Sequence, residues 1–416
     1  MKKRICTVVF LFIVIGVFIP RVEARFDIID HGARASGRAG AFVATADDGS
    51  AIYYNPAGLT QIKEGLFQEE VFFVFRYSKY ESPAGAGEKI TQVAMLPNTY
   101  LVANPESDSW KFGIGIYVPF GSFTEWSENG PLRYQATYNS LDTVVINPSL
   151  AFKINEDISV GLGADIYEGQ VVSRKMVNYG RTIPGAADGF YELISEKTYA
   201  LGYNLGLLYN IDESNRIGVS YRSRFSLYFD GNATISNIPT GAPGAPRTKV
   251  EAKAKYKFPD IFMIGYAHEF SDKLEMEADV HWINWSQHSS VLIDFEPEGV
   301  FTDTFIAKDY SDAFIYKLGL EYLLNDKFSL RTGCAYSSEP VPAATFDPAN
   351  PSNRRYSFYF GGGYKKNNFR AEMTLAATFF SDRYVDNSVG ASSGTSINGT
   401  YKTFIPQVTL GVNWRF

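Results

Sequence analysis

Few residues of this sequence have the type and spacing that catalysis or metal binding requires. Only four histidines occur, and none of them stands in the His-Glu-x-x-His setting of a zinc hydrolase: His31, His268, His281 and His288. A hydrolase site would need a serine and a histidine together on one face of the fold, and the sequence offers no such pair. The residue types therefore predict a protein that is not an enzyme and that holds no metal or cofactor.

Residues 37–59 are rich in glycine, alanine and aspartate and lack alternating hydrophobicity. Gly37-Arg38-Ala39-Gly40 follows no strand and has no Gly-Lys-Ser/Thr, which excludes a phosphate loop. Asp47-Asp48-Gly49 has only a fragment of the spacing of a calcium loop, and its acids suit pairing with arginines of a lumen wall. Small residues such as Gly40 permit close packing, and Asn55-Pro56 favours a turn that fixes the end of the stretch. We expect residues 25–65 to form a plug, with Gly40, Asn55 and Pro56 as its gating residues.

The first 24 residues have the features of a secretory signal peptide. Met1-Lys2-Lys3-Arg4 is basic, an apolar run of about 15 residues follows, and small residues precede a cleavage point after Ala24. That run is short for the rival interpretation, a membrane anchor. Residues 1–24 carry four basic side chains and one acidic side chain, a net +3, so the formal charge of −6 becomes −9 after cleavage. This balance argues against nucleic acid as a partner, and Cys334 is then the only cysteine, so no intrachain disulfide can form.

The rest of the chain has the pattern of a β-barrel. Aromatic residues make up 15% of the sequence and glycine numbers 36, while no apolar run approaches the roughly 20 residues of a membrane helix. Short turns such as residues 155–157 and 271–273 alternate with long loops such as residues 124–140 and 339–354. We predict an all-β fold, a transmembrane antiparallel β-barrel of about 14 strands over residues 66–416 with the small N-terminal hatch (plug) inside the lumen. A secreted β-sandwich or β-solenoid is the alternative.

Apolar and polar side chains alternate within the segments, as expected where one face meets lipid and the other a polar lumen. The pattern places Cys334 toward lipid, and His281 and His288 are expected to be ordinary lumen or girdle residues. A further segment is predicted to turn its apolar side chains to lipid and its polar side chains to the lumen: Ile217, Val219, Tyr221, Phe225, Leu227 and Phe229 against Arg216, Ser220, Arg222, Arg224 and Asp230.

The chain ends at an aromatic residue, Phe416, after apolar residues at every second position from Val408 onward. This ending resembles the signal that the barrel-assembly machinery of the bacterial outer membrane reads. We therefore expect that machinery as a partner during biogenesis, with outer-membrane lipid and lipopolysaccharide around a barrel that is a monomer.

Several blocks, in the right order over nearly the whole mature chain, resemble the FadL-like family of outer-membrane transporters for long-chain fatty acids and aromatic hydrocarbons. The early block runs from Gly37-Arg38-Ala39-Gly40 to Asn55-Pro56-Ala57-Gly58-Leu59, and later blocks include Phe258-Pro259-Asp260, Trp282-Ile283-Asn284-Trp285-Ser286 and Ser311-Asp312-Ala313-Phe314. The resemblance implies capture of a hydrophobic molecule outside, transfer to an inner pocket, movement of the hatch and release through a gap in the wall. The family's gap lies at a kinked strand, which matches Pro119, Phe120 and Gly121 here.

The resemblance also implies two basic residues that bind a carboxylate in the inner pocket. The first falls at Arg174-Lys175, with Lys175 at the matching place, and the second falls nearest to Lys308. A lysine common in the family beside the Asp312 block is Ser311 here, which keeps a neutral substrate open. The sequence therefore predicts passive uptake of hydrophobic compounds across the bacterial outer membrane, with long-chain fatty acids ahead of neutral aromatic hydrocarbons. A surface barrel without transport, such as an adhesin or phage receptor, is the other alternative.

Overall fold

The computed structural model describes residues 30–416 except 106, 108, 243–247 and 298–300. The predicted signal peptide, residues 1–24, lies outside the described residues. No helix in the described part of the chain combines the length and the apolar character needed to cross a membrane.

The strands pair in antiparallel order around a closed barrel, in which β1 (Leu66–Glu81) bonds to both β2 (Gly87–Ala103) and β21 (Gly399–Arg415). Seven of the crossings are interrupted and consist of two strand elements each, so the 21 elements make 14 crossings, which confirms the predicted barrel. The remaining elements are β3 (Trp110–Tyr117), β4 (Gly121–Glu125), β5 (Tyr138–Lys153), β6 (Ile158–Val177), β7 (Gly189–Ser195), β8 (Thr198–Asn210), β9 (Asn215–Arg222), β10 (Phe225–Ser236), β11 (Lys249–Phe258), β12 (Ile261–Ser271), β13 (Leu274–Ile283), β14 (Ser290–Glu296), β15 (Thr304–Ala307), β16 (Ala313–Leu323), β17 (Phe328–Ser337), β18 (Arg355–Lys366), β19 (Phe369–Phe380) and β20 (Arg383–Val385).

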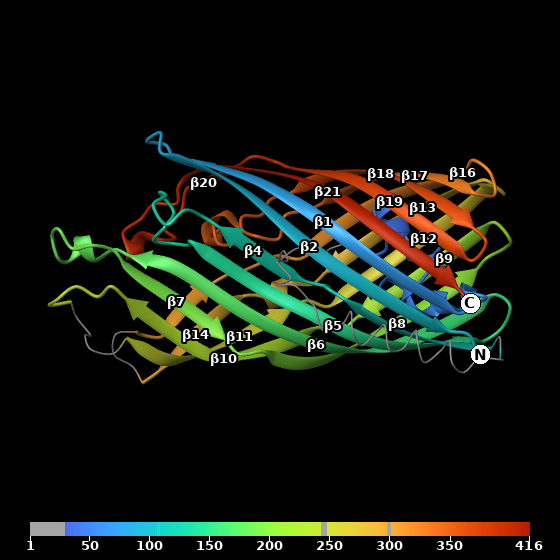
Figure 1. Ribbon diagram of the computed structural model, residues 1–416, viewed down its shortest axis with the longest axis horizontal. Coiled ribbons are helices and arrows are strands. Elements are labelled where there is room, and N and C mark those ends of the chain that lie inside the picture. Colours follow the sequence, from blue (N-terminus) through green and yellow to red (C-terminus); the bar gives the residue numbers. More distant parts are fainter. Residues whose placement is uncertain (1–29, 106, 108, 243–247, 298–300) are drawn as a thin grey trace.

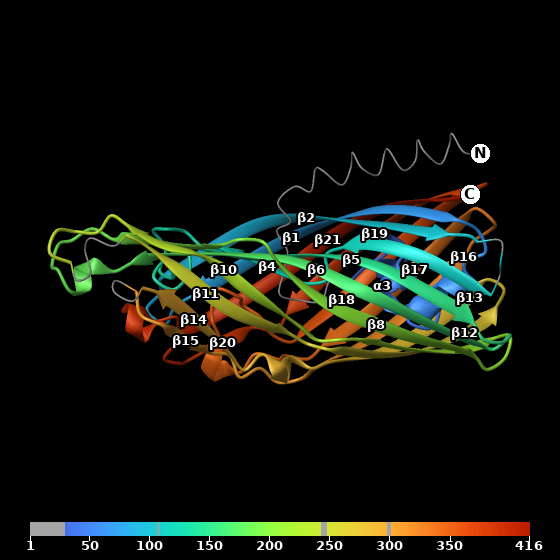
Figure 2. The ribbon, with the colours of Figure 1, turned by 90° about the horizontal axis from the view of Figure 1, so that it is seen from below.

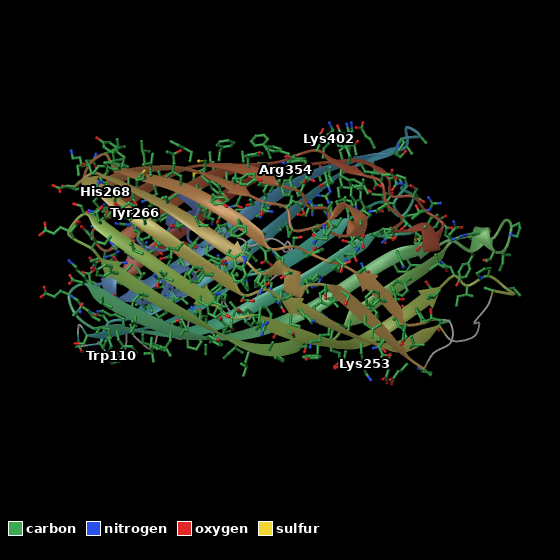
Figure 3. All side chains as sticks on the ribbon, turned by 180° about the vertical axis from the view of Figure 1, so that it is seen from behind. Trp110, Lys253, Tyr266, His268, Arg354 and Lys402 are labelled. Carbon is green, nitrogen blue, oxygen red and sulfur yellow. The ribbon has the colours of Figure 1, made fainter. Side chains whose placement is uncertain are left out.

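The barrel is elongated, with its long loops at one end and its short turns, together with the C-terminus, at the other (Figure 1). Short one-turn helices lie in the breaks and loops: η2 (Tyr179–Arg181), η3 (Trp285–Gln287), η4 (Ala343–Thr345) and η5 (Ala391–Ser393). Trp110, Tyr266 and His268 mark the short-turn end of the outer wall, and Lys253 and Lys402 lie nearer the long loops (Figure 3).

The outer wall is apolar because strand side chains alternate between the two faces. Along β8, every second side chain from Tyr199 to Tyr209 is 40–77% exposed and apolar, while the inward Asn204 is 1% exposed. Cys334 is exposed on this wall, as the alternation predicted. A hollow of about 700 Å³ also opens on the outer wall, across β1, β21, β19, β18 and β17, and its apolar lining suits contact with lipid.

Residues 30–65, here called the inner segment, lie inside the barrel (Figure 2). Its helices are short: α2 (Ala33–Gly37), α3 (Ala51–Tyr54) and η1 (Pro56–Gln61). Nearly every residue from His31 to Leu59 is buried, and α2 packs against β17, β18, β19 and β21 while η1 packs against β5, β6 and β8. The barrel wall therefore supplies the packing that such short helices cannot supply themselves.

One predicted assignment of faces is wrong. The two-residue break between β9 and β10 shifts the alternation, so Phe225 and Leu227 point inward and are 6% and 0% exposed. Phe229 is likewise 2% exposed, whereas Arg224 lies on the exposed outer side and bonds to Gln287. The prediction assumes that one continuous strand runs from Ile217 to Phe229. Residues an even number of positions apart share a face only along such a continuous strand, and the break between β9 and β10 ends that relationship.

Candidate functional site

Five aromatic side chains pack together inside the barrel, and four of them come from points where strands are interrupted. This aromatic cluster consists of Phe120, Tyr167, Phe225, Phe258 and Trp285, all at most 6% exposed. Four of the five lie in a break or at a strand end that borders one, because Phe120 precedes β4, Phe225 begins β10, Phe258 ends β11 and Trp285 is in η3.

The rings of the aromatic cluster pack closely. Phe225 stacks between Tyr167 and Phe258, with ring centroids 3.7 and 4.5 Å away. Phe120 lies 5.3 Å from Phe258 and 6.3 Å from Trp285. Such a cluster offers an apolar surface with no charge of its own, which suits binding of hydrocarbon.

A second ring group continues from the aromatic cluster through Trp285. His288 is 2% exposed and lies 5.1 Å from Tyr310 and 5.9 Å from Tyr256, ring centroid to ring centroid. His288 also bonds to the backbone carbonyl of Lys257, so its ring is held by the wall. This histidine is an inward residue, as expected, and its neighbours are aromatic rather than nucleophilic.

Lys175 and Lys308, here called the lysine pair, lie at the edge of these rings and share one acidic neighbour. The Nζ atom of Lys308 is 3.9 Å from a carboxylate oxygen of Asp347, and both side chains are 13% exposed. The same carboxylate acts electrostatically on Lys175, whose ammonium lies 5.4 Å from the ring centroid of Tyr191. In the described part of the chain Lys175 forms no ion pair within 4 Å, so Asp347 is within ion-pair distance of Lys308 but not of Lys175.

Arg174 does not join the lysine pair. Its side chain is on the outward face of β6, where Nε donates a 2.6 Å bond to Glu192 and the guanidinium lies over the ring of Tyr138. Neighbouring residues of a strand point to opposite faces, so Arg174 and Lys175 cannot both reach the lumen.

The ladder between β2 and the third crossing is incomplete. β2 pairs with β3 only from Thr99 to Ala103, β3 ends at Tyr117, and β4 begins at Gly121 and pairs with β5. Within the described residues, the backbone of 87–98 of β2 therefore pairs with β1 alone, although the side chains of Glu88 and Asn98 accept the N–H groups of Ser127 and Val118. We call the interval between this part of β2 and β4 the seam. The predicted kink residues Pro119, Phe120 and Gly121 lie where β3 ends and β4 begins, at one end of the seam. Proline cannot donate a backbone hydrogen bond to a ladder, which is consistent with an interruption at this point.

Arg76 of β1 spans the seam from inside. It is 6% exposed, and one terminal nitrogen donates to the carbonyl of Phe123 and to the hydroxyl of Thr124 on β4, at 3.1 and 3.3 Å. The other terminal nitrogen donates to the carbonyl of Pro351, 3.0 Å away, in the loop between β17 and β18. On the side of β4 that faces the seam, side-chain hydrogen bonds thus take the place of backbone hydrogen bonds.

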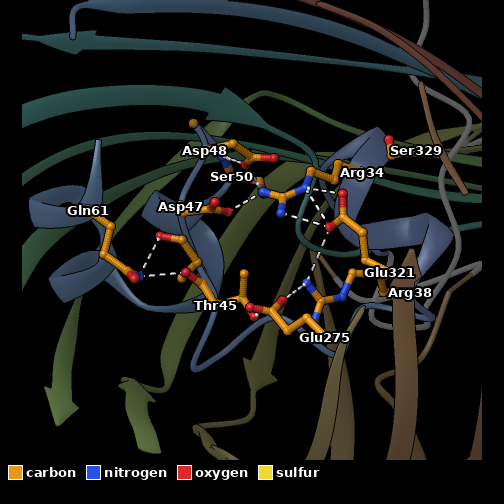
Figure 4. A network of polar contacts seen from close by, with 12 residues as sticks. Arg34, Arg38, Thr45, Asp47, Asp48, Ser50, Gln61, Glu275, Glu321 and Ser329 are labelled. Carbon is orange, nitrogen blue, oxygen red and sulfur yellow. Dashed lines mark hydrogen bonds and ion pairs between the residues drawn. The ribbon is translucent and has the colours of Figure 1, made fainter. Parts of the chain in front are cut away.

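The inner segment is fastened to the wall by buried ion pairs (Figure 4). Arg34 donates to both oxygens of Glu321 on β16, at 2.7–3.3 Å, and also bonds to Asp47. Arg38 is fully buried and pairs with Glu275 on β13 at 2.5 Å. The predicted pairing of the Asp47 region with an arginine is present, but the partner belongs to the inner segment itself. Bidentate, buried pairs of this kind are strong only while both partners stay in place.

Two acids of β13 bind the backbone of the inner segment directly. Asp279 accepts the N–H of Phe42 at 2.9 Å, and Glu277 accepts the N–H groups of Ala44 and Thr45 at 2.6 and 2.9 Å. The inner segment has little regular structure there, so wall carboxylates satisfy the donors that a helix or strand would otherwise satisfy.

Asn55 connects both halves of the inner segment and the wall. Its Nδ2 donates to the carbonyls of Val43 and of Leu207 on β8, at 2.8 and 3.0 Å, and its Oδ1 accepts the N–H of Ala57. Pro56 occupies the first position of η1, where a missing N–H costs nothing. A side chain at the facing Gly206 of β8 would bring its Cβ to 2.2 Å from Asn55 Oδ1, so the wall is recessed at this contact.

Gly40 lies in a turn of the inner segment. Its φ of +69° is unfavourable for other residues, and a Cβ would come within 2.5 Å of Asp30 and of the Lys317 ammonium. These two groups form a 2.8 Å ion pair between the inner segment and β16. Glycine is therefore required here both for backbone shape and for the ion pair.

Burial and charge shift the pKa values of two groups of the inner segment. Desolvation, followed by the positive charges of Arg222 and Lys317, lowers the pKa of His31 well below its usual 6.5, so this histidine is neutral. Burial alone would raise the pKa of Asp47, but the adjacent Arg34 guanidinium outweighs it and holds that pKa below its usual value. Among the described residues no group of three or more His, Cys, Asp or Glu is arranged to hold a metal ion.

The residues that sequence reasoning missed are Asp347, Arg76 and the inward phenylalanines of β10. Asp347 lies in a long loop that was treated only as a connection between strands, and Arg76 was one of many charges on strands. The one signal for Asp347 was its position between Phe346 and Pro348, an apolar setting for an acid in a loop.

A closed antiparallel barrel with an apolar outer wall, an enclosed N-terminal segment and a ring-lined interior defines a transmembrane β-barrel transport protein. Residues 22–416 match the family model described as "Outer membrane protein transport protein (OMPP1/FadL/TodX)", and the chain belongs to this family. It is an outer-membrane transport protein of the FadL/TodX type, which confirms the family and the location expected from the sequence.

Relatives and solved structures agree with this assignment. A long-chain fatty acid transport protein of Escherichia coli O6:H1 is 25% identical over 361 residues, covering 77% of this chain and 79% of the relative. Outer membrane protein P1 of Haemophilus influenzae is 23% identical over 387 residues, covering 82% and 83%. The fold is similar to that of a Pseudomonas aeruginosa FadL homologue, with a TM-score of 0.83 at 21% identity over 94% of this chain and all of the other. It is also similar to the Ralstonia pickettii toluene transporter TbuX, with a TM-score of 0.71 at 17% identity over the same shares.

Proposed function

We propose that this transport protein takes up hydrophobic compounds by passive diffusion, with long-chain fatty acids as its first class of substrate. The observation that carries the proposal is the lysine pair at the edge of the buried rings, because it joins a cationic head-group site to an apolar surface. The similarity to a protein named a long-chain fatty acid transport protein supports the same class. The chain belongs to a family of transport proteins, and in this proposal it acts as a channel and not as an enzyme.

The route begins at the long-loop end and passes between the rings of the aromatic cluster. A hydrocarbon chain gains about 0.8 kcal/mol for each CH₂ group that leaves water, so contact with these rings favours entry without an energy source. Because the rings are already packed on one another, they must separate to admit the chain. The carboxylate then remains beside Lys175 and Lys308.

Release is sideways, through the seam between β2 and β4. A hydrophobic molecule that leaves through a gap in the wall re-enters the hydrocarbon of the bilayer and avoids water. In this proposal the inner segment acts as the hatch, with Gly40, Asn55 and Pro56 at its moving contacts. Pro119, Phe120 and Gly121 keep the seam free of ladder bonds.

Neutral aromatic hydrocarbons are the second candidate. The aromatic cluster itself carries no charge, and one of the structures with this fold is named a toluene transporter. A ring-lined interior binds an arene by stacking as well as it binds an acyl chain.

Uptake separates the two candidates. Cells that lack their own carrier would receive this gene, and the entry of labelled oleate and labelled toluene would be measured. Faster entry of oleate supports the fatty acid proposal, and faster entry of toluene alone supports the hydrocarbon. If neither rate rises, transport of both classes is rejected and a surface receptor becomes the better interpretation.

A further inference from the structure

The loop between β17 and β18 carries an acidic residue, Asp347, at the position where the proposed substrate would place its carboxylate. Asp347 is 3.9 Å from the Lys308 ammonium and lies near enough to Lys175 to act on it electrostatically. The same carboxylate acts electrostatically on the phenols of Tyr256 and Tyr310 in the neighbouring ring group. A carboxylate on a short apolar stem, beside one lysine ammonium and near a second, has the chemistry of a fatty acid head group.

We propose that Asp347 is a built-in substitute for the substrate carboxylate, which a fatty acid must displace to bind. The inference rests on the proposed function and names carboxylates as the substrate class that the site distinguishes from neutral compounds. Asp347 is not within 4 Å of the Lys175 ammonium, its Oδ1 atom already accepts the N–H of Ala349 at 2.9 Å, and its 3.9 Å separation from Lys308 is long for a hydrogen bond. A fatty acid carboxylate can therefore approach the pair more closely than Asp347 does.

The segment on either side of Asp347 is held by contacts that lead to the seam. The indole N–H of Trp126, directly after β4, donates to the carbonyl of Pro348 at 3.0 Å. Arg76 donates to the carbonyl of Pro351 at 3.0 Å and, with its other nitrogen, to Phe123 of β4. The residues that hold β4 at the seam thus also hold the loop that carries Asp347.

Displacement of Asp347 then has a mechanical consequence. The carboxylate that leaves the lysine pair moves Pro348, which lies next to it in the chain, away from Trp126. Loss of that bond removes a contact that fastens the end of β4 to this loop, and β4 has no ladder bonds to β2 in the described residues to keep it in place. Binding of a head group and loosening of the exit are in this way coupled through one loop.

Two probes with the same chain test the inference: oleate, which carries a carboxylate, and oleyl alcohol, which does not. Purified full-length mature protein in nanodiscs would be titrated with each, using the fluorescence of tryptophan. For Asp347→Asn we expect oleate to bind about fivefold more tightly or better, because its competitor is gone, while the Kd for oleyl alcohol stays within about twofold. Asp382→Asn is the matched control, since Asp382 pairs with Lys402 at the exposed rim at 2.7 Å.

Hydrogen exchange supplies the readout that a purely structural role would not reproduce. We expect oleate to speed amide exchange in residues 121–126 of the wild type, and Asp347→Asn to show the faster exchange without ligand. If the Asn variant does not resist SDS at room temperature as a folded barrel does, Lys308→Gln takes its place. That variant should weaken oleate binding about fivefold or more and leave oleyl alcohol unchanged.

The outcomes separate this inference from the proposed function. Equal changes for oleate and oleyl alcohol, in either variant, would show that Asp347 merely supports the loop and would overturn the inference while leaving transport intact. Tighter oleate binding without any change of exchange at 121–126 would overturn the coupling to the seam. Wild-type protein that binds neither probe would reject the proposed function, and the inference with it.

Discussion

Arg174 and Lys175 are consecutive in the chain, yet their side chains lie on opposite faces of β6. Arg174 pairs with Glu192 on the outer face, whereas Lys175 faces the buried rings near Tyr191. The family resemblance placed Lys175, and not Arg174, at the matching position, and the strand geometry gives the physical reason why only Lys175 reaches the lumen.

The two residues give a matched pair of variants. Lys175→Gln removes an ammonium from the lysine pair, so we expect oleate uptake to fall about tenfold while toluene uptake is unchanged. Arg174→Gln removes an equal charge from the outer face and should leave both rates within about twofold. Uptake of the two labelled compounds in the same cells measures this, and equal losses in the two variants would contradict a head-group role for Lys175.

Asn55→Ala should loosen the inner segment. The change removes two donated bonds and one accepted bond between buried groups, each worth about 1 kcal/mol net. We expect residues 41–58 to become accessible to added protease and cells to become more sensitive to large antibiotics. Asn129→Ala, in an exposed loop, is the control. Unaltered protease protection together with unaltered antibiotic leakage would count against Asn55 as a gating residue.

Arg76→Gln should weaken the seam. Its guanidinium joins β1, β4 and the loop at Pro351, and a shorter neutral side chain cannot reach all three. We expect faster amide exchange in residues 121–125 and faster entry of hydrophobic compounds without a change in preference between oleate and toluene. Arg216→Gln, at the opposite end of the barrel, should leave the exchange of β4 unchanged. Slower entry through the Arg76 variant would argue that the seam is not the exit.

Phe225→Ala should lower the uptake of both classes of substrate. Phe225 stacks on two rings of the aromatic cluster, and a buried Phe→Ala change costs about 3–5 kcal/mol. Phe262→Ala, whose ring is 39% exposed on the outer wall, is the size-matched control. Retained uptake in Phe225→Ala, with folding confirmed by resistance to SDS, would place the route elsewhere.

Acid should release the inner segment, and His31 sets the pH range. The pKa of His31 in the folded protein is lowered below 6.5, mainly by burial. At a pH between this lowered pKa and the ordinary pKa of 6.5, His31 therefore takes up a proton when the inner segment is released or the protein unfolds. Stability from this group is complete above about pH 6.5 and falls by up to about 1.4 kcal/mol for each unit below it. The lowered pKa of Asp47 acts only in stronger acid, since its contribution is present above 3.8 and is lost as the pH falls toward its folded value.

The measurement is hydrogen exchange of residues 41–58 between pH 7 and pH 5, corrected for the intrinsic exchange rate. We expect protection to fall with acid in the wild type and to change much less in His31→Asn, which keeps a polar side chain near Asn98 but does not titrate. Identical pH profiles for the two proteins would remove His31 as the cause.

The barrel could be predicted from the sequence because its rule is local. Alternation of side chains and of turn lengths fixed the strand type, the number of crossings and the outward position of Cys334. The same rule failed at Phe225, because a break resets which face a residue occupies and nothing in the alternation itself marks the break. Four of the five residues of the aromatic cluster lie at or beside such breaks, so the alternation of side chains predicts the position of this cluster poorly.

Contacts between distant parts of the chain could not be predicted from the sequence, for a different reason. Asp347 meets Lys308 and Arg76 meets Thr124 only because a loop folds back into the barrel and a side chain crosses the seam. No periodicity predicts which of many charged residues will meet. The family resemblance supplied Lys175 and Lys308 but not Asp347, the acid beside Lys308.

The ion pair between Arg34 and Glu321 joins positions 287 residues apart, and it has a consequence for how the protein is made. The N-terminal residues leave the export machinery first, but their partners on β13, β16 and β19 exist as a surface only after those late strands have paired. Until then Arg34 and Arg38 lack their wall carboxylates, Glu321 and Glu275, and only Asp47 of the same segment is available to Arg34. The first part of the chain to arrive in the periplasm is thus the last to reach its final position. During assembly the inner segment must remain unbound until the strands of the barrel wall have paired around it.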